Sequence, residues 1–118
     1  MSDGVRRGEL YWLVLPRPGS TDRPHPHLVV QDDVFNASRV TTVVVMALTT
    51  NLRRATEPGN VLLDEGEGTL PRRSVVVVSQ VASVPKEALG ERIGTLSAER
   101  VDQAVAGLRF QQRSGFTR

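Results

Sequence analysis

Two runs rich in valine constrain this 118-residue chain more than any other feature. They are VTTVVVMAL at residues 40–48 and SVVVVSQVASV at residues 74–84. Valine is branched at Cβ, which favours an extended backbone over a helix. Because both faces of each run are apolar, both strands should be covered on both sides. We therefore expect them to occupy the interior of one sheet.

Three shorter segments predict further strands, since each is apolar and bounded by turn residues. They are GELYWLVL at residues 8–15, HLVVQ at residues 27–31 and NVLL at residues 60–63. Residues 16–26, PRPGSTDRPHP, predict a long loop of the kind that often carries function. Residues 32–39 carry turn residues.

One helix is predicted over SAERVDQAVAGLRFQQ at residues 97–112. Ser97 suits an N-cap, and one helix face carries the apolar side chains of Val101, Ala104, Val105 and Leu108. Gly107 should weaken the helix slightly. Five strands and a C-terminal helix predict a mostly β (α+β) domain, a small bent antiparallel sheet or SH3-like partly open barrel.

Length predicts a single domain over residues 1–118, and we expect flexible ends at residues 1–6 and 112–118. The chain has no cysteine, which excludes disulfides and thiolate chemistry. It lacks a signal-peptide core and any apolar run of about 20 residues, so we expect a cytoplasmic protein without a membrane partner. Its cations are nearly all arginines, a residue type suited to phosphate.

Both histidines, His25 and His27, lie in RPHPH, on either side of Pro26. Histidine is the side chain that titrates near neutral pH, which favours a general acid or base. The residue before proline is biased to extended geometry, so both rings should project to the same side. A solvated or hydrogen-bonded structural role is the alternative. Further ligands for a metal are not evident, and we expect none.

A second candidate constellation is LTTNLRRA at residues 48–55. Thr49 and Thr50 end the predicted third strand, and Asn51, Arg53 and Arg54 follow. Hydroxyl donors beside guanidinium groups can hold a phosphate. Alternatively, the Thr-Thr-Asn segment only caps the strand and the arginines are solvated. The nearby segment GEGTLPRR does not fit a phosphate-binding P-loop, because it lacks the lysine and precedes a strand.

The segments RGELYWLVL, HLVVQDDVFN, VVVMALTTNL, PGNVLL and GEGTLPRRSVVVVSQV occur in an order that resembles the MazF/PemK (Kid) toxins of bacterial type II toxin-antitoxin systems. The resemblance extends from Arg7 to about Phe110. It implies a MazF/CcdB-like fold and a homodimer that cleaves single-stranded RNA without a metal or other cofactor. It also implies attack of a ribose 2′-hydroxyl on the adjacent phosphate, a cyclic phosphate product, and a cognate antitoxin partner.

The resemblance also assigns residues. The family's catalytic arginine precedes a proline before the second strand, and counting back from Gln31 puts His25 at that position. If HP is an insertion, Arg23 takes the position instead; we favour His25. The family's threonine at the end of the third strand falls on Thr49.

These assignments imply that His25 accepts the 2′-hydroxyl proton, that Thr49 donates to the phosphate, and that Arg23 or Arg53 stabilises the transition state. Gln80, a polar residue in a valine run, is either a satisfied core amide or a site residue. The side chains expected to bind RNA are Arg17, Ser20, His27, Thr50, Asn51, Arg53, Arg54 and Gln80.

Two other functions are compatible with such a scaffold. CcdB-like toxins poison DNA gyrase by binding, but they depend on a C-terminal tryptophan. This chain ends in RSGFTR and has its only tryptophan at Trp12, which argues against that function. The remaining alternative is a binding module that has lost catalysis together with the family arginine.

Overall fold

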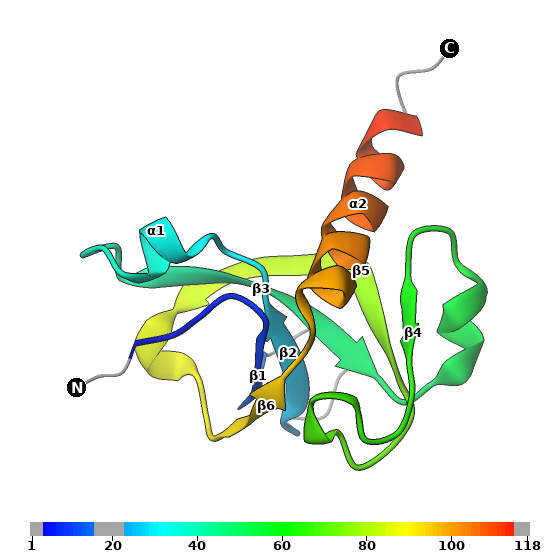
Figure 1. Ribbon diagram of the computed structural model, residues 1–118, viewed down its shortest axis with the longest axis horizontal. Coiled ribbons are helices and arrows are strands. Elements are labelled where there is room, and N and C mark those ends of the chain that lie inside the picture. Colours follow the sequence, from blue (N-terminus) through cyan, green and yellow to red (C-terminus); the bar gives the residue numbers. More distant parts are fainter. Residues whose placement is uncertain (1–3, 16–22, 115–118) are drawn as a thin grey trace.

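The computed structural model describes residues 4–15 and 23–114 (Figure 1). Six strands form one antiparallel sheet in the order β4-β5-β3-β2-β1-β6. The strands are β1 (Glu9–Leu13), β2 (His25–Val29), β3 (Thr42–Thr49), β4 (Val61–Leu63), β5 (Ser74–Pro85) and β6 (Arg92–Thr95). The helical segments are α1 (Asp33–Asn36), η1 (Leu52–Thr56), η2 (Glu67–Thr69), η3 (Lys86–Ala88) and α2 (Ala98–Ser114).

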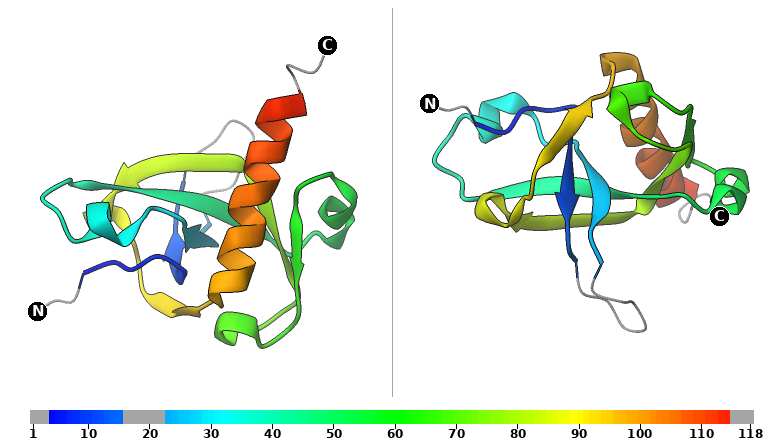
Figure 2. Two further views of the ribbon diagram at one scale, coloured as in Figure 1. Left: turned by 45° about the horizontal axis from the view of Figure 1, so that its top comes forward. Right: turned by 90° about the horizontal axis from the view of Figure 1, so that it is seen from below.

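The two valine-rich strands occupy interior positions, as the sequence predicts. β3 lies between β2 and β5, and β5 lies between β3 and β4. Their register shifts between Met46, which pairs with Val81, and Leu48, which pairs with Val76, so residues 77–80 of β5 lie opposite the single residue Ala47. Extra residues on one strand bend it. In the right-hand view of Figure 2, β1 and β2 run across the direction of β3 and β5, as expected for a curled sheet.

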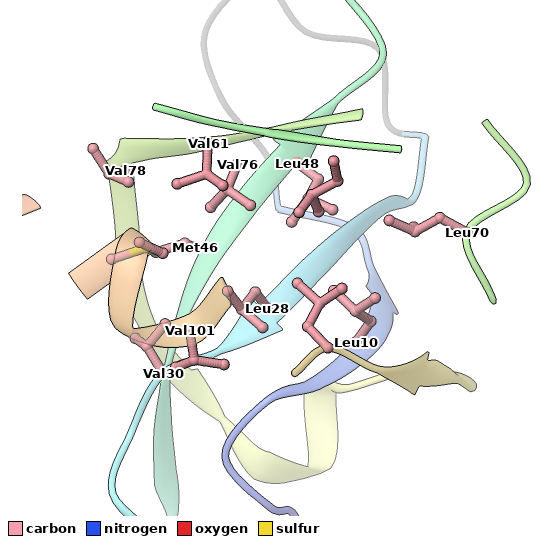
Figure 3. Packing of buried hydrophobic residues seen from close by; sticks show 13 residues of the cluster. Leu10, Leu28, Val30, Met46, Leu48, Val61, Leu70, Val76, Val78 and Val101 are labelled. Atoms are coloured by element: carbon pink, nitrogen blue, oxygen red, sulfur yellow. The ribbon is translucent and has the colours of Figure 1, made fainter. Parts of the chain in front are cut away.

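Alternate residues of the sheet pack into two apolar clusters, following the period of two along a strand. Leu28 and Met46 belong to the first cluster, which also takes in Val101 and Ala104 of α2. Figure 3 shows Leu28, Met46 and Val101 in this cluster. The second cluster is centred on Val29 and Val45. Helix α2 contacts β5 and β4, and thus covers one end of the curled sheet (Figure 1).

Strand β6 is the element that the sequence analysis missed, so the predicted count of five strands was wrong. Ile93 is its only large apolar residue, and the strand forms because it pairs with β1. The η2 turn packs against it: the Thr69 hydroxyl donates to the Ile93 carbonyl oxygen, and a Cβ on Gly94 would lie 2.7 Å from the Gly68 carbonyl carbon. The turn between β4 and β5 therefore bridges the two edges of the sheet, and the predicted partly open barrel is confirmed.

Smaller differences concern the ends of elements. β2 begins at His25 rather than His27, because His25 and Pro26 pair with β1. A short helix, α1, occupies part of the predicted turn, with Asp32 accepting from the Val34 amide at 2.8 Å. Helix α2 has the predicted cap, since the Arg100 amide donates to Ser97 Oγ at 3.2 Å, and it continues to Ser114. No helix of the described part of the chain is long and apolar enough to cross a membrane.

Candidate active site

A pocket of about 290 Å³ opens where β1 and β2 meet the segment that leads into β5. Four parts of the chain line it: β1, the start of β2 with the residues before it, the loop after β3, and the segment that leads into β5. The lining residues are Trp12, Arg23, Pro24, His25, Pro26, Thr50, Leu70, Pro71, Arg72 and Ser74. The pocket thus combines apolar side chains with an imidazole, two guanidinium groups and two hydroxyls.

The sheet brings His25 and Thr49 to the same end of neighbouring strands. The last residue pair of the β2–β3 ladder is His27 with Ala47. The ladder therefore ends two residues before His25 and Thr49 could pair, and Thr49 is not among the residues that line the pocket. Both side chains are half-buried, and His25 lines the pocket.

The hydroxyl of Thr49 is held by the turn that follows it. Its Oγ1 accepts from the Asn51 amide at 3.1 Å, and Asn51 Oδ1 accepts from the Arg53 amide at 3.2 Å, which caps η1. The segment therefore has a capping role, which is one of the two roles that the sequence allowed for it. A hydroxyl that accepts a hydrogen bond can still donate its own proton, so the cap leaves Thr49 able to donate to a phosphate.

The arginines near this sheet end differ in their surroundings. Arg54 Nε lies 2.8 Å from Glu57 Oε2, and this contact lowers the pKa of Glu57. Arg54 is thus engaged within its own turn. Within residues 4–15 and 23–114, no carboxylate lies within ion-pair distance of Arg23, Arg53 or Arg72. Arg23 and Arg72 line the pocket, and their charge gives it a positive potential.

His27 lies in a different environment from His25. It has 2% of its surface exposed, and its Nδ1 lies 2.9 Å from the His25 carbonyl oxygen. Burial removes His27 from the surface that RNA could reach, so the structure does not support its predicted RNA-binding role. The alternative raised by the sequence, a structural histidine, describes it.

The other predicted residues divide into three groups. Thr50 lines the pocket, and Asn51 and Arg53 are exposed beside it in the chain. Gln80 is half-buried in the bend of β5 and is not among the pocket residues. Arg17 and Ser20 lie outside the described residues.

Of the pocket residues, the sequence analysis named only Arg23, His25 and Thr50; Trp12 and Arg72 are among those it missed. Arg72 belongs to the segment that did not fit a P-loop, and its carbonyl oxygen accepts from Ser74 Oγ at 3.0 Å. The available signal was the PRR triplet directly before a buried strand. For a metal, the described residues offer no group of three or more histidine, aspartate or glutamate side chains that could bind one.

Comparison with known proteins identifies the family. A profile of the PemK-like, MazF-like toxins of type II toxin-antitoxin systems matches residues 6–111. The chain is 37% identical over 107 residues to "Endoribonuclease MazF6" of Mycobacterium tuberculosis, which covers 89% of this chain and 94% of that protein. It is 31% identical over 108 residues to "Endoribonuclease EndoA" of Bacillus subtilis, covering 90% of this chain and 92% of that protein.

Solved structures show the same fold. The "Mycobacterium tuberculosis toxin MazF-mt6" superposes with a TM-score of 0.73 at 24% identity, covering 89% of this chain and 96% of that one. An "Endoribonuclease in complex with its cognate antitoxin from Mycobacterial species" superposes with a TM-score of 0.73 at 22% identity, covering 92% and 95%. With the profile match over most of its length, the chain belongs to the PemK-like, MazF-like toxins of type II toxin-antitoxin systems.

Proposed function

We propose that this protein is a toxin endoribonuclease that cleaves single-stranded RNA at the pocket beside His25. The observation that carries the proposal is the composition of this pocket, in which His25, Thr50 and two arginines meet. The names of the relatives, endoribonucleases at 37% and 31% identity, support the same reaction.

The reaction follows from the chemistry of these side chains. The His25 imidazole accepts the proton of a ribose 2′-hydroxyl, and the resulting oxygen attacks the adjacent phosphorus. The bond to the 5′-oxygen breaks, and that oxygen takes a proton from solvent. The products are a 2′,3′-cyclic phosphate and a 5′-hydroxyl.

Charge that develops on the phosphate during this step must be offset. The Thr49 hydroxyl is oriented by the Asn51 amide and donates to a phosphate oxygen. Arg72 and Arg23 supply positive charge from the pocket wall. With these donors in place, the proposed reaction needs no metal ion.

The relatives also indicate partners. One similar structure is an endoribonuclease bound to its cognate antitoxin, which supports a cognate antitoxin for this chain. We further propose that the toxin acts as a homodimer and in the cytoplasm, where messenger RNA is found. Trp12 lies in the first strand and lines the pocket, a position unlike the C-terminal tryptophan of a gyrase poison.

Incubation of the purified protein with unstructured RNA in excess EDTA tests the proposal. We expect cuts at a short recurring sequence, with cyclic phosphate on one fragment and a 5′-hydroxyl on the other, identified by mass spectrometry. His25→Ala should reduce the rate by about 100-fold or more. Activity that requires added divalent metal, or full activity in His25→Ala, would contradict this mechanism.

A further inference from the structure

We propose that the pocket binds one unpaired nucleobase stacked on Trp12, next to the phosphate that is cleaved. This inference rests on the proposed function and assigns the part of the site that holds the RNA. It concerns Trp12 and Arg72, which lie 60 residues apart in the sequence and line the same pocket.

The walls of the pocket are suited to the face of an aromatic ring. Trp12 and Pro26 are paired in the β1–β2 register, so their side chains lie next to each other on one face of the sheet. Pro24 and Pro71 line the same pocket, and proline rings offer flat apolar surface without a donor. Trp12 is half-buried, which leaves part of the indole accessible. These four side chains form an apolar slot.

The rim of the slot is polar and positively charged. Arg72, His25 and Thr50 line the pocket beside the apolar walls. No described carboxylate lies within ion-pair distance of Arg72, so its charge is not offset within the described chain. An aromatic platform next to guanidinium groups is the combination that binds single-stranded RNA, because the base stacks while the phosphate is neutralised.

The backbone that carries the Trp12 platform is held in place before RNA arrives. The Trp12 amide donates to the Glu91 carbonyl oxygen at 3.0 Å, and the Trp12 carbonyl oxygen accepts from the Gly90 amide at 2.7 Å. A Cβ on Gly90 would lie 2.7 Å from that carbonyl oxygen, so only glycine permits this approach. Elsewhere in the pocket lining, Ser74 Oγ donates to the Arg72 carbonyl oxygen. A preorganised pocket costs less ordering entropy on binding.

An apolar side chain of a protein partner is the other occupant that such a slot could take. The charge at the rim favours RNA, because a nucleobase always carries a phosphate on the same chain. The pocket also contains His25, so a base bound on Trp12 lies beside the group that would act on its phosphate. Occupation by protein alone is therefore an outcome of the test below.

Trp12 is the only tryptophan of the chain, so tryptophan fluorescence reports on this pocket alone. The full-length His25→Ala variant, in which RNA should stay intact, is titrated with an unstructured RNA oligonucleotide and with an abasic ribose-phosphate chain of equal length. Fluorescence anisotropy of a dye on each chain measures binding separately. We expect the base-containing RNA to quench Trp12 to saturation and the abasic chain to leave the emission unchanged.

Cleavage by Trp12 variants provides a second, independent measurement. Trp12→Ala should lower kcat/KM by about 5- to 150-fold, the range expected for loss of one stacked base, mainly through KM. Trp12→Phe retains an aromatic face and should recover most of the activity. Circular dichroism of both variants checks folding.

The possible results separate the two proposals. RNA that binds by anisotropy without quenching Trp12 overturns the base pocket and leaves the endoribonuclease function intact. Quenching by RNA with no cleavage by the wild-type protein supports the pocket and overturns the proposed reaction. Quenching by a purified antitoxin but by no RNA would assign the slot to a protein side chain, which also overturns the inference.

Discussion

Gly59 and Gly107 are in backbone contact, so that a Cβ on Gly59 would lie 2.8 Å from the Gly107 carbonyl oxygen. Gly59 also has φ +93°, a conformation that L side chains rarely adopt. Close by, Gln111 Nε2 donates to the Pro58 carbonyl oxygen at 3.2 Å. The contact seats helix α2 against the turn before β4. A glycine that the sequence analysis considered only a weakness of the helix thus permits its docking.

Gly107→Ala should destabilise the protein despite the better helix propensity of alanine. The added methyl group would collide with the backbone at Gly59, and overpacking of this kind costs about 1–3 kcal/mol, more than the gain of about 1 kcal/mol from propensity. Urea denaturation would measure the free energy of unfolding. Gly4→Ala is the control, because a Cβ there meets nothing within 4 Å; a Gly107→Ala protein as stable as this control would refute the docking argument.

Asn60 should contribute more stability than Asn51, the N-cap of η1. The Asn60 side chain donates to the Arg54 carbonyl oxygen at 2.9 Å and to Glu57 at 3.0 Å, and it accepts from the Val78 amide at 3.1 Å. Asn60→Ala should cost about 2–3 kcal/mol, since it removes three hydrogen bonds, including the one that the part-buried Val78 amide donates. Asn51→Ala removes one exposed cap and should cost about 1 kcal/mol. The reverse order in chemical denaturation would show that Asn60 does not pin the turn.

The ion pair of Glu67 with Arg100 should make stability depend on acid pH. Arg100 donates to both carboxylate oxygens, at 2.9 and 2.8 Å, and these hydrogen bonds lower the pKa of Glu67 below its ordinary value. A carboxylate whose pKa is lower in the folded state stabilises the fold above its unfolded pKa, and the contribution is lost as pH falls through the acid range.

Glu67→Gln should therefore destabilise the protein at pH 7 by about 1 kcal/mol, an estimate for a partly exposed pair. The difference from the wild type should shrink as pH is lowered below the ordinary pKa of glutamate, about 4.3. Thermal denaturation across pH 3–7 measures this, with the exposed Glu65→Gln as control. An equal deficit at both ends of the range would assign the loss to packing instead.

Replacement of His25 by the arginine usual in the family tests whether the wild-type protein uses imidazole as its base or has lost the family's catalytic group. With imidazole as the base, His25→Arg should lower the initial rate of cleavage, because a guanidinium stays protonated and cannot accept the 2′-hydroxyl proton. Initial rates of both proteins on the same RNA test this. An inactive wild type that becomes active as His25→Arg would identify a toxin that has lost its catalytic group.

Thr49→Ser should retain most of the cleavage activity, whereas Thr49→Val should lose about 100-fold or more because it removes a donor to the phosphate. Both substitutions are close in size to threonine. Because Thr49 Oγ1 also accepts from the Asn51 amide, the melting temperature of each variant is needed alongside the rate. Equal rates for the two variants would exclude a role for the hydroxyl.

Local patterns were sufficient for five of the six strands and for the main helix. Valine at residues 40–48 and 74–84 restricts the backbone to extended geometry wherever it lies, and Ser97 caps its helix through a contact three residues away. By contrast, Ile93 alone could not indicate β6, since this strand depends on pairing with β1. The partner strand β1 lies about 80 residues earlier, so a short sequence window around Ile93 does not include it.

The residues of the candidate site show the same difference between local sequence patterns and tertiary contacts. His25 and Thr49 could be singled out in the sequence, because the two histidines flank Pro26 and Thr49 ends a strand recognisable by its own residues. Residue order did not reveal that His27 is buried while His25 lines a pocket, nor that Trp12 and Arg72 share that pocket. Those relations arise when the sheet bends at residues 77–80 and the turns close over its end. Backbone preference acts between neighbours in sequence, whereas a pocket is made by contacts between segments that meet only after folding.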